Sequence, residues 1–171
     1  MEKNKDKEKS TEKDIERIAV QEARLRFKAF NENTAWALGS LLRTQAEGRG
    51  VAVTIEIRLA QETVFFYAMP GTAPTNADWA RRKRNTVELL HRSSYVTGLM
   101  FQRENDSLEN EMGLPIRDYA SHGGSFPIFV DGVGCIGAVT VSGLPQRDDH
   151  TMVVNALATL CDVPFTEVAL D

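Results

Sequence analysis

The segment from Tyr119 to His150 constrains the fold of this chain more than any other part of the sequence. It contains six of the twelve glycines, in a His-Gly-Gly loop, two apolar runs and a Ser-Gly-Leu-Pro connection to a polar, acidic stretch. Glycine accepts positive φ angles and lets two backbones approach closely. We therefore expect tight turns in this segment, or a pocket in which the backbone meets a ligand.

Two pairs of apolar runs predict two β-hairpins. Valine and isoleucine occupy alternate positions in residues 51–58, which is the period of a half-buried strand, and residues 63–68 follow after a short turn. Residues 125–130 and 134–142 are joined through Asp131-Gly132, a strong short-range hairpin signal. The sequence therefore predicts four strands in two hairpins.

Apolar residues at helical spacing predict helices before, between and after these hairpins. The first expected helix covers residues 14–29. The second begins at a cap, either Asn31 or Asn33, and stops at Glu47. Three further helices are expected over residues 77–92, 95–105 and 146–160. Asn76 is the expected cap of the third helix, and the polar residues 104–118 are expected to form a loop or lid. This order predicts an α/β (α+β) fold with a mainly antiparallel sheet flanked by helices.

The length of 171 residues suits one domain. Residues 1–13 are rich in Lys, Asp and Glu and contain no apolar residue after Met1. Such a composition buries too little surface to offset the entropy of ordering. We therefore expect a disordered charged tail over residues 1–13 and a single domain over residues 14–171.

Charge and hydropathy exclude several classes of partner. The formal net charge of -4 gives no general basic footprint for nucleic acid. No apolar run approaches the roughly 20 residues that cross a bilayer, and the basic N-terminus has no apolar segment behind it, so we expect no signal peptide. Cys135 and Cys161 lack metal-ligand spacing and are expected to be small buried hydrophobes. We expect a cytoplasmic protein.

Lys83 emerges from the middle of an apolar helix face that also carries Trp79, Thr86 and Leu90. A long charged side chain in this position can extend along apolar surface to reach water. It can also reach an anion in a pocket, such as a carboxylate. The sequence leaves both interpretations open.

Two histidines flank the glycine-rich segment, and a histidine can act as acid, base or metal ligand near neutral pH. His122 precedes two glycines on a loop, where it either holds the turn or reaches a ligand. His150 follows Asp148 and Asp149 at the start of the last expected helix, where capping alone explains both carboxylates. A metal held by His122 or His150 would need further groups from elsewhere, because three adjacent residues cannot all face one ion.

The sequence motifs of hydrolases and of dinucleotide-binding proteins are absent. Ser142-Gly143 ends a strand before a helix, but the G-x-S-x-G pattern and the partners of a catalytic triad are absent. No G-x-G-x-x-G opens a helix after a strand, and no phosphate-binding loop is present. The sequence therefore predicts neither a hydrolase nor a dinucleotide site, and it identifies no catalytic residue.

Three blocks of the sequence resemble the uncharacterised protein family 0303: NADWARRKRNTVELLHRSS, HGGSFPIFV and GCIGAVTVSGLPQRDDH. That family is grouped with the haem-degrading-type domains, which resemble the haem-binding HbpS, GlcG and the C-terminal part of the PduO adenosyltransferases. The resemblance covers about residues 15–165. It implies an HbpS/GlcG-like domain with profilin-like layering that assembles into homodimers or higher homo-oligomers.

For the wider superfamily the resemblance also implies binding of haem or a related tetrapyrrole, and in some members iron-linked redox sensing. The strand-to-helix turn of the superfamily matches Ser142, Gly143, Asp148 and Asp149, whereas the histidines match the subfamily's own motif. The expected ligand-binding residues are Lys83, His122, Gly123, Gly124, Ser142, Gly143, Asp148, Asp149 and His150.

Three functions stay open at this point. The first is a ligand-binding homo-oligomer that takes haem, a related tetrapyrrole or a small carboxylate, with a histidine as the usual axial donor to haem iron. The second is an enzyme in which His122 and the Asp148/Asp149 pair perform acid–base or metal-assisted chemistry. The third is an interaction module that presents its surface to a chaperone or targeting partner.

Overall fold

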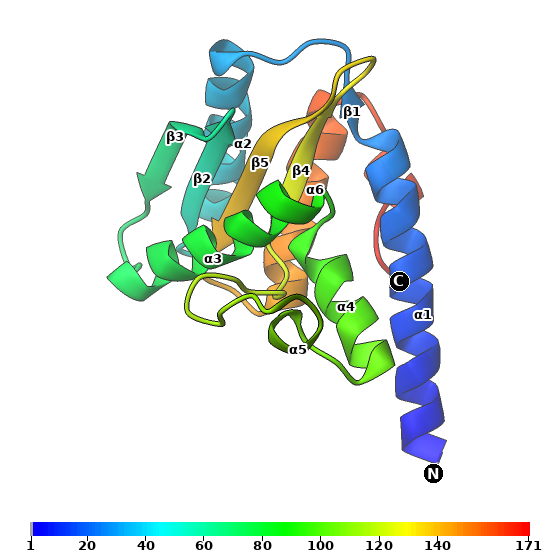
Figure 1. Cartoon of the computed structure of the whole chain (residues 1–171). Coiled ribbons are helices and arrows are strands. Elements are labelled where there is room, and N and C mark those ends of the chain that lie inside the picture. Colours follow the sequence, from blue (N-terminus) through cyan, green and yellow to red (C-terminus); the bar gives the residue numbers. More distant parts are fainter. Residues whose placement is uncertain (1) are drawn as a thin grey trace.

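A five-stranded sheet between two layers of helices forms the fold (Figure 1). The computed structural model describes the backbone of residues 2–171 and the side chains from Glu8 onward. The strands lie in the order β1-β4-β5-β2-β3. Their bounds are β1 Arg26–Phe27, β2 Thr54–Leu59, β3 Glu62–Ala68, β4 Ser125–Val130 and β5 Gly134–Ser142.

Helices cover both faces of this sheet. Their bounds are α1 Glu2–Arg24, α2 Glu32–Gly48, α3 Pro74–Leu90, α4 Ser94–Glu104, α5 Leu108–Met112 and α6 Gln146–Leu160, followed by the short 3-10 helix η1 Phe165–Glu167. Helices α2 and α6 pack together on one face, and α3 lies across the other (Figure 1). Helix α1 packs on α4 at the side of the sheet where β1 lies.

The two predicted hairpins are both present. Strands β2 and β3 pair antiparallel, as do β4 and β5. Strand β2 also pairs antiparallel with β5, which joins the hairpins into one sheet. Gly132 has a φ of 75° in the turn before β5, a conformation that favours glycine. The predicted α/β (α+β) fold with a mainly antiparallel sheet is confirmed.

The structure corrects the expected end of the first helix. Helix α1 ends at Arg24, not near residue 29, because Arg26 and Phe27 pair parallel with Phe129 and Val130 of β4. This fifth strand was not predicted.

Two other boundaries differ from the prediction. Helix α3 begins at Pro74, and Asn76 lies inside its first turn, where Oδ1 accepts the backbone N–H of Ala73 at 2.8 Å. The expected loop at residues 104–118 contains α5, whose N-cap Ser107 accepts the N–H of Asn110 at 3.2 Å. A side-chain cap stabilises even this short helix.

Helix α1 includes residues 2–13, for which the composition predicts a disordered tail; Met1 lies outside the described residues. Lys and Glu are good helix formers, so the helix can continue from the part that is packed. That part is anchored by ion pairs from Glu12 to Arg103 and from Asp14 to Arg147. The predicted domain boundary at residue 14 stays a prediction.

The main core lies between the sheet and the α2–α6 layer. Its fully buried side chains include Leu38, Leu42, Ile55, Ile57, Phe126, Val139, Val153 and Leu157. Both cysteines are free thiols and half-buried. Within residues 2–171, none of the helices combines the length and the apolar character that spanning a bilayer requires.

Candidate functional site

A cavity of about 310 Å³ opens where β5 ends, between the starts of α3 and α6. Helix α3, the His-Gly-Gly loop, the turn after β5 and the first residues of α6 all contribute to its wall. The lining residues are Thr75, Asn76, Trp79, Lys83, His122, Gly123, Ser142, Gly143, Leu144, Gln146 and Asp149.

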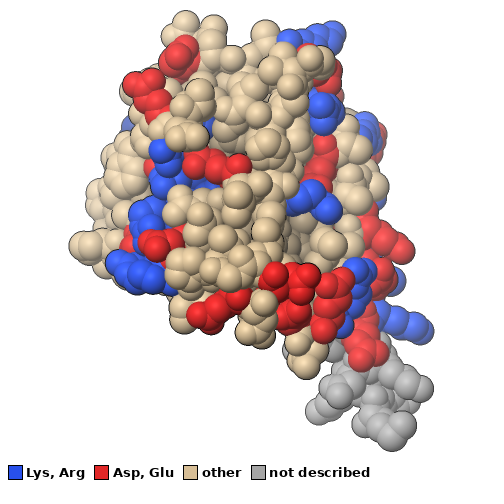
Figure 2. All heavy atoms as spheres, in the orientation of Figure 1, with Lys and Arg blue, Asp and Glu red and all other residues tan. Residues whose placement is uncertain are grey.

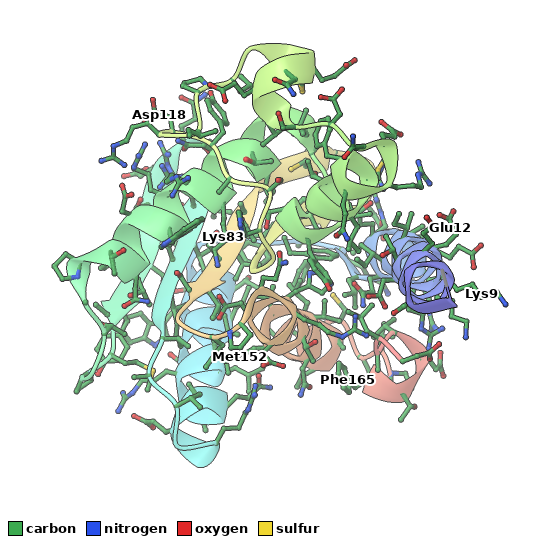
Figure 3. The ribbon with its side chains drawn as sticks, turned by 90° about the horizontal axis from the view of Figure 1, so that it is seen from below. Lys9, Glu12, Lys83, Asp118, Met152 and Phe165 are labelled. Carbon is green, nitrogen blue, oxygen red and sulfur yellow. The ribbon has the colours of Figure 1, made fainter. Side chains whose placement is uncertain are left out.

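Lys83 ties these segments together. Its side chain extends from α3 toward the end of β5 and the start of α6, and it is only 3% exposed (Figure 3). Nζ donates hydrogen bonds to the carbonyl oxygens of Gly123 at 3.0 Å and Val141 at 2.7 Å. It also donates to Oδ2 of Asp149 at 3.1 Å. All three ammonium hydrogens therefore have an acceptor, as burial of a lysine requires.

Asp149 is buried beside Lys83 and is equally well satisfied. Oδ1 accepts the N–H of Leu144 at 3.0 Å, and Oδ2 lies 3.4 Å from the N–H of Gly143. Burial raises the pKa of Asp149 and lowers the pKa of Lys83, while their mutual attraction opposes both shifts. This aspartate therefore fixes the turn after β5 and compensates the ammonium charge.

The two glycines after His122 are required by close backbone contacts. A Cβ at Gly123 would lie 2.2 Å from the carbonyl oxygen of Gln146. Gly124 has a φ of 128°, and a Cβ there would lie 2.5 Å from Nζ of Lys83. Any side chain at either position would push the loop away from α6 and the buried lysine.

His122 lies exposed at the mouth of the cavity, with its ring edge-on to Trp79 at a centroid distance of 4.9 Å. Within the described residues no group hydrogen-bonds to the imidazole. Partial burial lowers the pKa of His122, and the positive charges of Lys83 and Arg82 lower it further. The ring is therefore neutral at pH 7, with one nitrogen free to donate and the other free to accept.

Trp79 of α3 also lines the cavity. The guanidinium group of Arg82 lies over its ring, 4.2 Å from the centroid, on the next turn of the same helix surface. A cation held over an indole face restricts the rotation of both groups. The tryptophan thus presents a fixed apolar surface beside the His122 imidazole.

The structure brings most of the predicted ligand-binding residues to this one cavity. Lys83, His122, Gly123, Ser142, Gly143 and Asp149 line it directly. Gly124 lies behind Lys83 and permits the approach of the loop. Asp148 and His150 are placed elsewhere.

His150 is fully buried in the core, away from the cavity. Its ring packs on Tyr95 and Phe126, and Nε2 lies 2.8 Å from Oε1 of Gln21. Gln21 uses its own N–H to donate to Val168, so the imidazole nitrogen must be the donor to Oε1. Burial, with a smaller contribution from the charge of Arg147, lowers the pKa of His150 to about 3.

Asp148 lies on the opposite side of the α6 N-terminus. It lines a second cavity of about 340 Å³ together with Gln45, Arg49 and Phe165. Figure 3 shows the α6 residue Met152, which also lines this second cavity, and Phe165 on the side of α6 remote from Lys83.

These positions limit the chemistry that the predicted residues can perform together. His122 and His150 do not face one point, and among the described residues no three His, Cys, Asp or Glu side chains are arranged to hold a metal ion. The carboxylate of Asp149 is already occupied by Lys83 and two backbone amides. The cavity therefore offers His122 as its accessible titratable group.

Several lining residues were not predicted as site residues. Trp79 precedes Lys83 by one helical turn on the same stripe, so that spacing is a signal that could have identified it. Thr75, Asn76 and Gln146 carry no comparable signal, because their role depends on two helices starting at the same place.

Comparisons with known proteins agree with this fold. The family described as haem degrading protein HbpS-like matches residues 30–158. A UPF0303 protein of Azotobacter vinelandii is 57% identical over 160 residues, which cover 94% of this chain and 96% of that protein.

Two solved structures extend the comparison. The crystal structure of the Ybr137w protein has a TM-score of 0.80 and 26% identity, and the match covers 86% of this chain and 87% of that chain. The PduOC:heme complex has a TM-score of 0.65 and 19% identity, covering 76% and 94% of the two chains, which shows a shared fold. The resemblance predicted from the three sequence blocks is thereby confirmed, and the chain belongs to the HbpS-like family, among the UPF0303 proteins.

Proposed function

We propose that this protein is a binding module for a small carboxylate-bearing ligand, which it takes up in the cavity between α3 and α6. The observation that carries the proposal is the exposed, neutral imidazole of His122 at the mouth of a cavity where two helices begin. The neutral ring can donate a hydrogen bond to a carboxylate oxygen.

The helix starts support an anionic ligand. The first residues of α3 and α6 both lie in the cavity wall, so the positive ends of two helix dipoles are directed toward it. The charges of Lys83 and Asp149 compensate each other, so they do not cancel the positive potential of the two helix ends. Trp79 supplies an apolar surface for the remainder of the ligand.

The volume supports a small ligand. Pockets for drug-sized molecules span about 300–1,000 Å³, and this cavity of about 310 Å³ lies at the lower end of that range. A carboxylic acid of a few carbon atoms fits such a space.

Haem is the second candidate, because the related PduOC fold was solved as a heme complex and an accessible histidine is the usual axial donor. His122 has the chemistry of an axial ligand, but a tetrapyrrole does not fit inside this cavity. Only its edge could enter, with the remainder of the macrocycle outside or covered by another copy of the chain.

Tryptophan fluorescence tests the first candidate directly. The chain has two tryptophans, and Trp36→Phe leaves Trp79, in the cavity wall, as the only one. We expect a saturable fluorescence change with acetate, glycolate or succinate at constant ionic strength, and none with acetamide or succinamide. His122→Ala should weaken binding about tenfold, the effect of one charge-assisted hydrogen bond.

His91→Ala is the matched control, because His91 ends α3 and lies outside this cavity. If no carboxylate gives a saturable change, or if His91→Ala weakens binding as much as His122→Ala, the carboxylate proposal fails.

A haemin titration with albumin as the non-specific reference tests the second candidate. A defined stoichiometry and a sharp Soret shift that disappear in His122→Ala but persist in His91→Ala would support haem binding. An albumin-like response in all three proteins would exclude it.

The remaining expectations stay predictions. Acid–base or metal-assisted chemistry would have to proceed without Asp148, which lines the other cavity. Homo-oligomerisation and a cytoplasmic location are likewise predictions.

A further inference from the structure

The second cavity lies between the end of α2 and the start of α6, with Phe165 of η1 in its wall. Its volume is about 340 Å³, and it shares no lining residue with the cavity that contains His122. Figure 3 shows Met152 and Phe165 on the side of α6 remote from Lys83. The two cavities are therefore separate sites.

Arg49 and Asp148 bring opposite charges to this cavity, and both side chains are exposed. Among the side chains from Glu8 onward, neither one forms an ion pair or a hydrogen bond with the other or with a third residue. Helix ends explain each charge by itself, because Arg49 follows the carbonyl end of α2 and Asp148 lies in the first turn of α6. They do not explain why two opposite, unpaired charges line one cavity.

Pairing of opposite charges is common elsewhere in the molecule. In Figure 2 acidic and basic side chains lie next to each other over much of the visible face. On the two helices that form the cavity, Arg43 pairs with Glu47, and Arg147 pairs with Asp14. The unpaired charges in the cavity wall therefore differ from their neighbours on the same helices.

Two amide side chains in the same wall also lack partners. Within the part of the chain whose side chains are described, the amides of Gln45 and Asn155 form no hydrogen bond, although Oε1 of Gln45 is buried. A buried acceptor that has lost water without gaining a donor is unfavourable. A ligand that supplies hydrogen bonds to this wall would remove that penalty.

Apolar side chains complete the cavity. Met152 is only 2% exposed, and Phe165 is half-buried. Both line the cavity beside the charged and amide groups. A methionine is flexible and polarizable, so it can adapt to apolar groups of different shape.

We propose that this second cavity binds a free α-amino acid with an apolar side chain. Arg49 pairs with the carboxylate of the ligand, and Asp148 accepts hydrogen bonds from its ammonium group. The apolar side chain of the ligand contacts Met152 and Phe165. A ligand with a single charge would leave either Arg49 or Asp148 unpaired, whereas an amino acid satisfies both.

The volume agrees with a ligand of this size. Pockets for drug-sized molecules span about 300–1,000 Å³, and the second cavity lies near the lower end of that range. A single amino acid fits there, and a longer peptide would extend outside. The proposal is independent of whether the first cavity binds a carboxylate, because no residue is shared.

Isothermal titration calorimetry with leucine, methionine and phenylalanine tests the proposal on the full chain. We expect saturable binding at one site per chain for at least one of them. N-acetylleucine lacks the ammonium group and leucinamide lacks the carboxylate. Each should bind at least about tenfold more weakly than leucine, the effect of losing one charge-assisted contact.

Variants locate the site. Arg49→Gln and Asp148→Asn should each weaken binding at least about tenfold, and both should fold, because both side chains are exposed. Arg43→Gln and Glu47→Gln are the matched controls, since they remove charges of the same two signs from α2 outside the cavity. They should keep the wild-type affinity.

Leucine also carries a carboxylate, so the titration is repeated in His122→Ala, which changes only the first cavity. This variant should bind leucine as the wild type does. A loss of leucine binding in His122→Ala, with unchanged binding in Asp148→Asn, would assign the amino acid to the first cavity and overturn the proposal.

Three further results would contradict it. The first is the absence of saturable heat with all three amino acids, and the second is equal affinity for leucine and N-acetylleucine. The third is an Arg43→Gln variant that weakens binding as much as Arg49→Gln does. Tighter binding of leucylglycine than of leucine would overturn the assignment to a free amino acid.

Discussion

A buried ammonium group requires acceptors on several sides, and Lys83 finds them on three segments of the chain. Its charge therefore holds the wall of the cavity together and is not free to bind a ligand. The exposed His122 is left as the group that can meet a ligand, with a neutral ring at pH 7.

Asp149→Asn should destabilise the protein by about 3–5 kcal/mol, because it leaves the buried charge of Lys83 without a counterion. Adding Lys83→Met should recover part of the loss, since the uncompensated charge is then gone. Urea unfolding of both single variants and the double variant measures this coupling. Losses that simply add would contradict the role assigned to the pair.

His150 should make the protein less stable in mild acid. The pKa of this histidine is about 3 in the folded protein and about 6.5 when unfolded, so between these values the unfolded chain binds more protons. The free energy of unfolding should therefore fall by up to about 1.4 kcal/mol per pH unit as the pH drops below about 6.5.

Urea unfolding at about pH 7 and about pH 5 checks this dependence. His150→Gln should flatten the slope, while His91→Gln, at the exposed end of α3, should keep it. Equal slopes in wild type and His150→Gln would show that His150 does not control acid stability.

Periodicity places Lys83 in the middle of an apolar stripe, and in the structure its side chain is buried. Periodicity cannot identify the counterion of Lys83, because Asp149 is 66 residues away in the sequence. Its neighbour Asp148 carries the same charge and the same capping preference. Which of two adjacent carboxylates faces inward depends on the rotation of α6 against the sheet. That rotation is a property of the packed structure.

At the scale of elements, close packing decides where glycine is needed. Gly98 lies inside α4, and a Cβ there would be 2.0 Å from the carbonyl oxygen of Ser121. Gly48 ends α2, and a Cβ added there would have no neighbouring atom within 4 Å. Helix propensity alone would predict a gain of up to about 1 kcal/mol for alanine at either site.

Gly98→Ala should instead destabilise the protein by about 1–3 kcal/mol, the cost of overpacking against fixed backbone. Gly48→Ala should be neutral or slightly stabilising. Thermal or urea unfolding of the two variants distinguishes packing from propensity. A stabilised Gly98→Ala would mean that α4 can move away from the loop.

Local patterns predicted the hairpins well, because alternation and the Asp131-Gly132 turn act between neighbours in the sequence. Strand β1 could not be predicted in the same way. It consists of Arg26 and Phe27, and its ladder with β4 joins residues about one hundred positions apart. Two residues are too few to show a hydrophobic periodicity, and the partner strand is far away in the sequence.

For the whole molecule, homo-oligomerisation, which the family resemblance predicts, would link folding to association. Because a dimer dissociates on unfolding, mass action raises the melting temperature with protein concentration. We expect this dependence in the wild type. Differential scanning calorimetry over a range of concentrations measures it. A melting temperature independent of concentration would argue against a dimer in the folded state.

The contact between Lys83 and Asp149 has a consequence for synthesis, because the ribosome makes the lysine 66 residues before its counterion. Until α6 has emerged, Lys83 has no counterion for burial, so α3 packs on the sheet less favourably. A nascent or truncated chain that lacks Asp149 would keep this face open to chaperones and proteases. Burial of one lysine thus distinguishes finished chains from interrupted ones.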